Sequence, residues 1–234
     1  MTVNKELIQK FKNEASMLGP QVYVANTKEE ALSYILKLIQ DKDIKVVVKS
    51  GSELAARLGL REHLEKNGVK VTETQIVQWI LDLSQGKAVP LEQVAGLVSS
   101  ATGDKVAAEP EAILVAARRA LKDAYINADL GITQADFGIA ETGTLVTLEN
   151  EGNARLSAAL PRLHLTLLQG DCIVSNLAEA ADRIKSGNGG LPGHKVPTFI
   201  TYLTGRNTTA DIPGAIFARA QGPAEEHILL INKE

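Results

Sequence analysis

Apolar positions along the chain follow two spacings, and these spacings predict helices that alternate with strands. Apolar residues recur every three or four positions near the amino terminus and again after Thr27, which is the pattern of helices with one buried face. Pro90 and Pro110 open two further helices. Strand and helix therefore alternate through residue 127, which predicts an α/β fold with a mainly parallel sheet flanked by helices. The strands predicted in this half lie at residues 21–25, 44–48 and 69–72.

The carboxyl-terminal half continues with shorter elements. Two buried strands, at residues 137–140 and 145–148, are expected to be joined by a polar turn. A small polar loop follows at residues 205–211. The last two apolar runs, 215–218 and 227–232, predict a terminal hairpin. The other elements predicted here are helices at 153–160 and 177–185 and strands at 162–168, 173–174 and 197–204.

Acidic residues gather around the two buried strands of this half. Asp136, Glu141, Glu149 and Glu151 all lie within a few positions of a strand end. A carboxylate this close to a buried strand is costly unless it is solvated, paired or used by the protein. Open α/β sheets place their ligands at strand ends, so these acids predict a functional site. The alternative is an acidic, solvated loop.

A strand that leads through a small polar loop into a helix offers free backbone N–H groups, which can bind an anion. Lys49, Ser50 and Gly51 form such a loop after the strand at 44–48, and Lys49 would add positive charge. The alternative is an ordinary capped helix with an exposed lysine. The loop at 205–211 could form a second anion-binding nest of backbone amides.

Composition narrows the class of protein. The chain has 234 residues, of which 44% are hydrophobic, and its net charge is −3, values that are ordinary for a globular protein. No basic cluster indicates a nucleic-acid surface. No apolar run approaches the roughly 20 residues that cross a bilayer, and the amino terminus lacks the apolar segment of a signal peptide. We therefore expect a cytoplasmic protein without membrane insertion.

The residue types that bind metals are sparse. Cys172 is the only cysteine, which excludes an internal disulfide. It also excludes an iron–sulfur cluster held by this chain alone, because such clusters need about four ligands. The four histidines show no zinc-type spacing, so we expect no metal or other cofactor bound by the chain itself. His164 lies among leucines of a predicted strand and is expected to be a core histidine.

The segment from Gly131 to Thr144 reads GITQADFGIAETGT and is the most specific of several ordered motifs. Together these motifs resemble those of the LUD-domain family, which contains the lactate utilization proteins B and C. The resemblance implies a Rossmann-like fold, similar to the sugar-isomerase and coenzyme A transferase group. It also implies an N-terminal helical extension, residues 1–43, packed on a LUD domain, residues 44–234. The other matching blocks are Lys49–Ser50, 150–153 (NEGN), 160–162 (LPR), 208–212 (TTADI) and 222–227 (GPAEEH).

The resemblance implies a role in the oxidation of L-lactate to pyruvate, with iron–sulfur clusters in other subunits. Because the chain lacks a cysteine-rich ferredoxin-like portion, it looks like protein C of the family. One hypothesis is therefore an accessory subunit, with A- and B-like iron–sulfur subunits as partners; a homo-oligomer is an alternative assembly. The other hypothesis is a self-contained enzyme of the coenzyme A transferase or sugar-isomerase type, acting on an anionic small molecule.

In the enzyme hypothesis, Glu141 or Asp136 is the acid/base or the nucleophile. Arg162 either pairs with Glu141 or Glu151, or it binds the substrate. One polar pocket that touches both Glu141 and the two anion-binding loops would support this hypothesis. The candidate ligand-binding residues are Lys49, Ser50, Gly51, Thr142, Gly143, Thr144, Asn150, Gly152, Asn153, Arg162, Thr208, Thr209 and Asp211.

Overall fold

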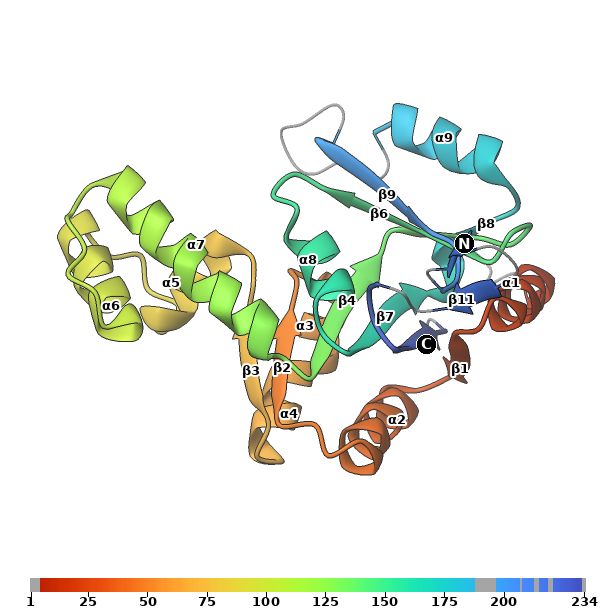
Figure 1. Cartoon of the computed structure of the whole chain (residues 1–234), viewed down its shortest axis with the longest axis horizontal. Coiled ribbons are helices and arrows are strands. Elements are labelled where there is room, and N and C mark those ends of the chain that lie inside the picture. The colour runs from red at the N-terminus through yellow and green to blue at the C-terminus, as the bar shows by residue number, and fades with distance from the viewer. Residues whose placement is uncertain (1–4, 188–196, 207, 213–214, 219–220, 233–234) are drawn as a thin grey trace.

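A six-stranded parallel sheet forms the centre of the protein (Figure 1). The computed structural model describes residues 5–187, 197–206, 208–212, 215–218 and 221–232. Every strand of this sheet is parallel to its neighbours, so the predicted α/β fold with a mainly parallel sheet is confirmed. In spatial order the strands are β1 (Gln21–Ala25), β12 (Glu225–Ile231), β7 (Leu163–Gln169), β4 (Leu130–Ala135), β2 (Val46–Lys49) and β3 (Lys70–Glu73).

Helices cover both faces of this sheet because its strands are apolar on both sides. Leu165 and Leu167 of β7 pack into one core with α2 (Lys28–Asp41), α3 (Glu53–Leu58) and α4 (Leu60–Lys66). Leu168 of the same strand packs on the opposite face with α1 (Lys5–Met17). Successive strand residues point to opposite faces, so this alternation follows from the pleat. The short helix α8 (Asn153–Ala159) covers β4 on the same face as α1.

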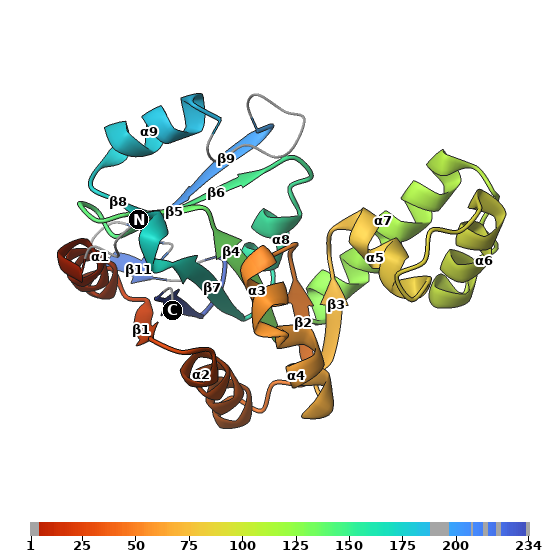
Figure 2. The ribbon, with the colours of Figure 1, turned by 180° about the vertical axis from the view of Figure 1, so that it is seen from behind.

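Three helices form a lobe beside the sheet. They are α5 (Ile76–Leu83), α6 (Leu91–Thr102) and α7 (Pro110–Asn127). Trp79 is buried in the core of this lobe, and Val48 of β2 joins the same cluster. Figures 1 and 2 show that α5, α6 and part of α7 project to one side of the molecule.

A second, four-stranded sheet was not predicted, although its strands were. Its order is β8 (Ile173–Val174), β5 (Phe137–Ile139), β6 (Thr144–Glu149) and β9 (Phe199–Leu203). β6 is antiparallel to both β5 and β9, whereas β5 is parallel to β8. One side of this sheet is buried by α9 (Leu177–Lys185), which lies over it in Figure 1.

The predicted terminal hairpin is wrong. β11 (Ala215–Ala218) pairs antiparallel with β10 (Thr208–Ile212), which falls in the segment predicted to be a loop. β12 instead enters the main sheet between β1 and β7, where its run of apolar residues is buried. β1 lies within the predicted N-terminal extension, so this extension contributes a strand to the main sheet as well as two helices. The domain boundary between residues 43 and 44 stays a prediction.

Candidate functional site

A polar cavity of about 570 Å³ lies at the carboxyl ends of β2, β3 and β4. After β2 the chain runs outward to β3 and then crosses back to β4, on the other side of β2. The strand order therefore reverses between β2 and β4, and open α/β sheets bind ligands in the crevice beside such a reversal. The polar cavity is lined by Ser50, Gly51, Ser52, Glu53, Gln75, Gln134, Asp136, Thr147, Leu148, Glu149, Asn150, Glu151, Asn153 and Ala154.

The loop after β2 is held against β4 by Gln134. Ser52 caps α3 by accepting a hydrogen bond from Ala55 N at 2.9 Å, and its hydroxyl donates to Gln134 Oε1 at 2.8 Å. Leu54 N donates to the same amide oxygen at 3.0 Å. Ser52 and Gln134 therefore form one fixed wall of the polar cavity.

Asp136 directly follows β4 and is half-buried in another wall of the cavity. Its Oδ2 accepts a hydrogen bond from Leu148 N at 2.7 Å. Burial raises the pKa of Asp136 to about 6; the nearby Glu149 adds to this rise, and the backbone hydrogen bond from Leu148 opposes it. A carboxyl group with such a pKa can both accept and donate a proton near neutral pH, as general acid–base catalysis requires.

The segment after β6 supplies two more carboxylates. Glu149 is 5% exposed; its Oε2 accepts from Ala154 N at 2.8 Å and its Oε1 lies 3.2 Å from Arg155 Nε. Burial nevertheless raises the pKa of Glu149 above its ordinary value. Glu151 is exposed and accepts from Ile76 N, at the start of α5, at 3.4 Å. Both carboxylates line the same cavity as Asp136.

Lys49, the positive charge predicted at this site, is paired with a carboxylate of the protein itself. Lys49, at the end of β2, is buried and forms an ion pair with Glu73 at the end of β3. The other oxygen of Glu73 accepts from Thr74 N at 2.8 Å and from Gln75 N at 3.0 Å. Among the described residues that line the polar cavity, four are carboxylates and none is lysine, arginine or histidine. This lining fits a hydroxyl, amide or ammonium group better than the anion expected from the sequence.

Part of the predicted site is assembled here. Gly152, with a φ of 78° that favours glycine, begins α8 at the edge of this region. Asn150 accepts through Oδ1 from Thr198 N at 2.8 Å, which ties the loop after β6 to β9. The predicted residues that line the polar cavity are Ser50, Gly51, Asp136, Asn150 and Asn153.

The turn from Glu141 to Thr144 lies elsewhere. Glu141 is exposed, does not line the polar cavity, and donates its backbone N–H to Ser175 O at 3.1 Å. A Cβ placed on Gly143 would lie 2.4 Å from the backbone nitrogen of Ala15, so the turn packs directly on α1. Thr144 Oγ1 lies 2.7 Å from the hydroxyl of Thr142 and is buried. Neither the polar cavity nor the neighbouring cavity beside Lys49 includes Glu141.

Arg162 does not extend the site. Arg162 is exposed at the amino end of β7. The polar cavity lies at the other end of the strands of this sheet, where their carboxyl ends meet. No salt bridge within the described part of the chain joins it to Glu141 or Glu151. The remaining predicted ligands have side chains outside the described part of the structure: Thr208, Thr209 and Asp211.

Several residues at the site were missed by the sequence analysis, among them Gln134, Glu73 and Gln75. Gln134 lies within the matching family motif, but no strand was predicted at β4 (Leu130–Ala135), and the amide of Gln134 was not considered as a site residue. Glu73 and Gln75 follow the strand predicted at 69–72, and an acid directly after a strand was a usable signal. The same rule that selected Asp136 would have selected Glu73.

The described residues do not fit a metal centre. No group of three or more histidine, cysteine, aspartate or glutamate side chains among them is arranged to hold a metal ion. Burial, together with the neighbouring Asp171, raises the pKa of the Cys172 thiol to about 11, so this thiol stays protonated. No helix in the described part of the chain is both long and apolar enough to span a membrane.

Comparison with known proteins places the chain in a family. The family description that matches is the LUD domain, over residues 8–231. The chain belongs to the LUD domain family. It is 30% identical over 224 residues to Lactate utilization protein B of Macrococcus caseolyticus and 32% identical over 224 residues to the protein of the same name in Bacillus subtilis. Each alignment covers 92% of this chain and 45% of the relative, so the LUD chain spans about half the length of these relatives.

A solved structure supports the fold assignment. A DUF162 family protein from Deinococcus radiodurans superposes with a TM-score of 0.54 over 97% of both chains, at 14% sequence identity. This likeness shows the shared fold. The sequence relatives carry the name protein B, so the predicted likeness to protein C in particular is not supported.

Proposed function

We propose that this LUD chain is the α/β component of a lactate utilization system whose iron–sulfur clusters are bound outside it. Family membership and the names of its relatives support the pathway. The observation that supports clusters bound outside this chain is its single cysteine, Cys172, whose thiol is protonated. An iron–sulfur cluster needs about four ligands, which are usually thiolates. Partner polypeptides, or regions like those in the unmatched half of protein B, would then hold the redox centres.

Purification from cells that grow on L-lactate tests this proposal. The tagged chain is expected to co-elute with cysteine-rich proteins, and iron should follow those partners rather than the LUD chain after dissociation. Elution of the chain without such partners, together with unchanged growth on L-lactate after its deletion, would refute the proposal.

A second candidate function is catalysis at the polar cavity. It is favoured by Asp136, whose pKa of about 6 lies in the range useful for proton transfer and which lines a cavity at the strand reversal. Here Asp136 would exchange a proton with a substrate, and the amide groups of Gln75, Gln134 and Asn153 would orient substrate hydroxyl groups. Glu149 would keep the pKa of Asp136 high by its negative charge.

A matched pair of variants separates the two candidate functions. Asp136→Asn keeps the size of the side chain and removes the titrating proton, whereas Glu141→Gln does the same outside the cavity. With lactate-dependent dye reduction by the purified complex as the readout, catalysis predicts that only Asp136→Asn loses turnover, by about 100-fold or more. Unchanged turnover in Asp136→Asn would remove the catalytic candidate and leave the accessory role standing.

A further inference from the structure

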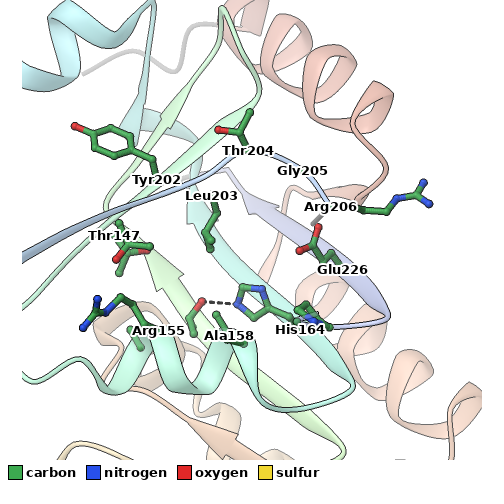
Figure 3. A pocket seen from close by; sticks show the side chains of 16 residues that line it. Thr147, Arg155, Ala158, His164, Tyr202, Leu203, Thr204, Gly205, Arg206 and Glu226 are labelled. Atoms are coloured by element: carbon green, nitrogen blue, oxygen red, sulfur yellow. Dashed lines mark hydrogen bonds between the residues drawn. The ribbon is translucent and has the colours of Figure 1, made fainter. Parts of the chain in front are cut away.

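A second cavity of about 380 Å³ lies beside the polar cavity, between α8, β9 and the face of the main sheet. We call it the His164 cavity. Thr147 and Ala154 line both cavities, which are therefore neighbours. Its apolar walls come from Ala158 of α8 and Leu203 of β9, and Figure 3 shows Leu203 and the imidazole of His164 pointing toward the same space. A volume of this size, lined by apolar side chains together with polar ones such as Thr133, His164 and Glu226, is typical of small-molecule sites.

His164 supplies a hydrogen-bonding atom that the protein leaves unused. Its side chain is 3% exposed, and Nε2 lies 2.9 Å from Thr133 Oγ1 and 3.3 Å from Thr166 Oγ1. No residue in the described part of the chain hydrogen-bonds to the other ring nitrogen, Nδ1. His164 lines the cavity, and Figure 3 shows its imidazole directed into it. A ligand oxygen in the cavity can therefore hydrogen-bond to Nδ1.

The charge in this cavity selects against anions. Burial lowers the pKa of His164 to about 4, so the imidazole is neutral at physiological pH. Arg155 pairs with Glu149 and stacks on the ring of Phe199 at 3.9 Å, and Figure 3 shows its guanidinium directed away from His164. The guanidinium of Arg206 is also directed away and lies against Gly19, at the end of α1. No described arginine is therefore available to hold a carboxylate beside His164.

We propose that the His164 cavity binds an uncharged, mainly apolar small molecule whose carbonyl or hydroxyl oxygen hydrogen-bonds to His164 Nδ1. In either tautomer of a neutral imidazole one nitrogen donates and the other accepts, so Nδ1 can pair with either type of oxygen. The proposal stands on this cavity alone and does not rest on the proposed role in lactate utilization. It also excludes lactate and pyruvate anions as ligands here.

Three probes that share one ring test the ligand class on the whole chain. Acetophenone carries a carbonyl, 1-phenylethanol a hydroxyl, and benzoate a carboxylate of similar size. With isotope-labelled histidine, the Nδ1 resonance of His164 should move when acetophenone or 1-phenylethanol is added. Benzoate should bind at least about tenfold more weakly, because its charge would be buried without a partner. Equal binding of benzoate, or no movement of Nδ1 with either uncharged probe, would overturn the proposal.

Two variants of the same residue locate the contact. His164→Asn places an amide near the position of Nδ1, whereas His164→Gln places one near Nε2 and keeps the contact with Thr133. We expect His164→Gln to weaken acetophenone binding about tenfold, the loss for one unmade hydrogen bond, and His164→Asn to retain it. Equal affinity in both variants would contradict the assignment of Nδ1. If neither variant folds, the labelled wild-type spectrum alone decides.

Discussion

Replacing Asp136 by asparagine should make the protein more stable at neutral pH. The pKa of Asp136 is about 6 in the folded chain, against an ordinary value of 3.8. The stability that this group contributes is therefore complete below pH 3.8 and is lost as the pH rises through 6. The difference in pKa corresponds to at most about 3 kcal/mol above pH 6. Asparagine is never ionised and can still accept the hydrogen bond from Leu148 N, so it avoids this loss.

Urea unfolding followed by circular dichroism, at intervals from pH 4 to pH 8, measures the effect. The free energy of unfolding of Asp136→Asn should exceed that of wild type by up to about 3 kcal/mol above pH 6 and converge with it near pH 4. Asp123→Asn, at an exposed position on α7, is the matched control and should show no such pH-dependent gain. A variant that is less stable at neutral pH, or a difference that does not change with pH, would refute the reasoning.

Three other perturbations test the packing around the site. Lys49→Met leaves the Glu73 carboxylate buried without its partner and should cost about 3–5 kcal/mol in urea unfolding, and adding Glu73→Gln should recover most of this loss. Gly143→Ala should lower stability by more than Gly68→Ala does in thermal melts, because both glycines have positive φ but only Gly143 contacts α1. The pKa of His164 is about 4 in the folded chain, against an ordinary value of 6.5, so its contribution to stability is complete above pH 6.5 and is lost as the pH falls through 4. This loss amounts to at most about 3 kcal/mol. The free energy of unfolding of His164→Gln should therefore fall less steeply in acid than that of wild type.

Local patterns predicted most of the helices and strands, although not β4 or β10, because each pattern depends on neighbouring residues. The helix expected at 177–185 is α9 with the same bounds, and Thr27 caps α2 by accepting from Glu30 N at 3.1 Å. Strand pairing depends on distant residues, which explains why the second sheet was missed. The apolar residues of β12 predict a buried strand but not the strands with which it pairs, because β1 and β7 lie far away along the chain.

The candidate site shows the same limit. Asp136 was predictable because an acid next to the end of a buried strand is a local signal. The ion pair of Lys49 with Glu73 was not, because the two residues meet only when β2 and β3 pair. The pairing changes the chemistry of the site, since a lysine expected to attract an anion is neutralised by its neighbour. The amide of Gln134 became a site residue for a similar reason, because its partner Ser52 lies in the loop after β2.

Asp136 and Glu141 occur in one sequence motif but lie in different parts of the structure: Asp136 lines the polar cavity and Glu141 does not. Between them lies β5, and a strand of three residues carries the chain about 10 Å. Asp136 remains at the cavity because Leu148 N of the neighbouring β6 holds its carboxylate, at 2.7 Å. β5 then passes close to α1, since a Cβ on Gly138 would lie 3.0 Å from the ring of Phe11, and the chain turns at Glu141. A ligand held by Asp136 would therefore meet Glu149, and the catalytic hypothesis reduces to this pair of carboxylates.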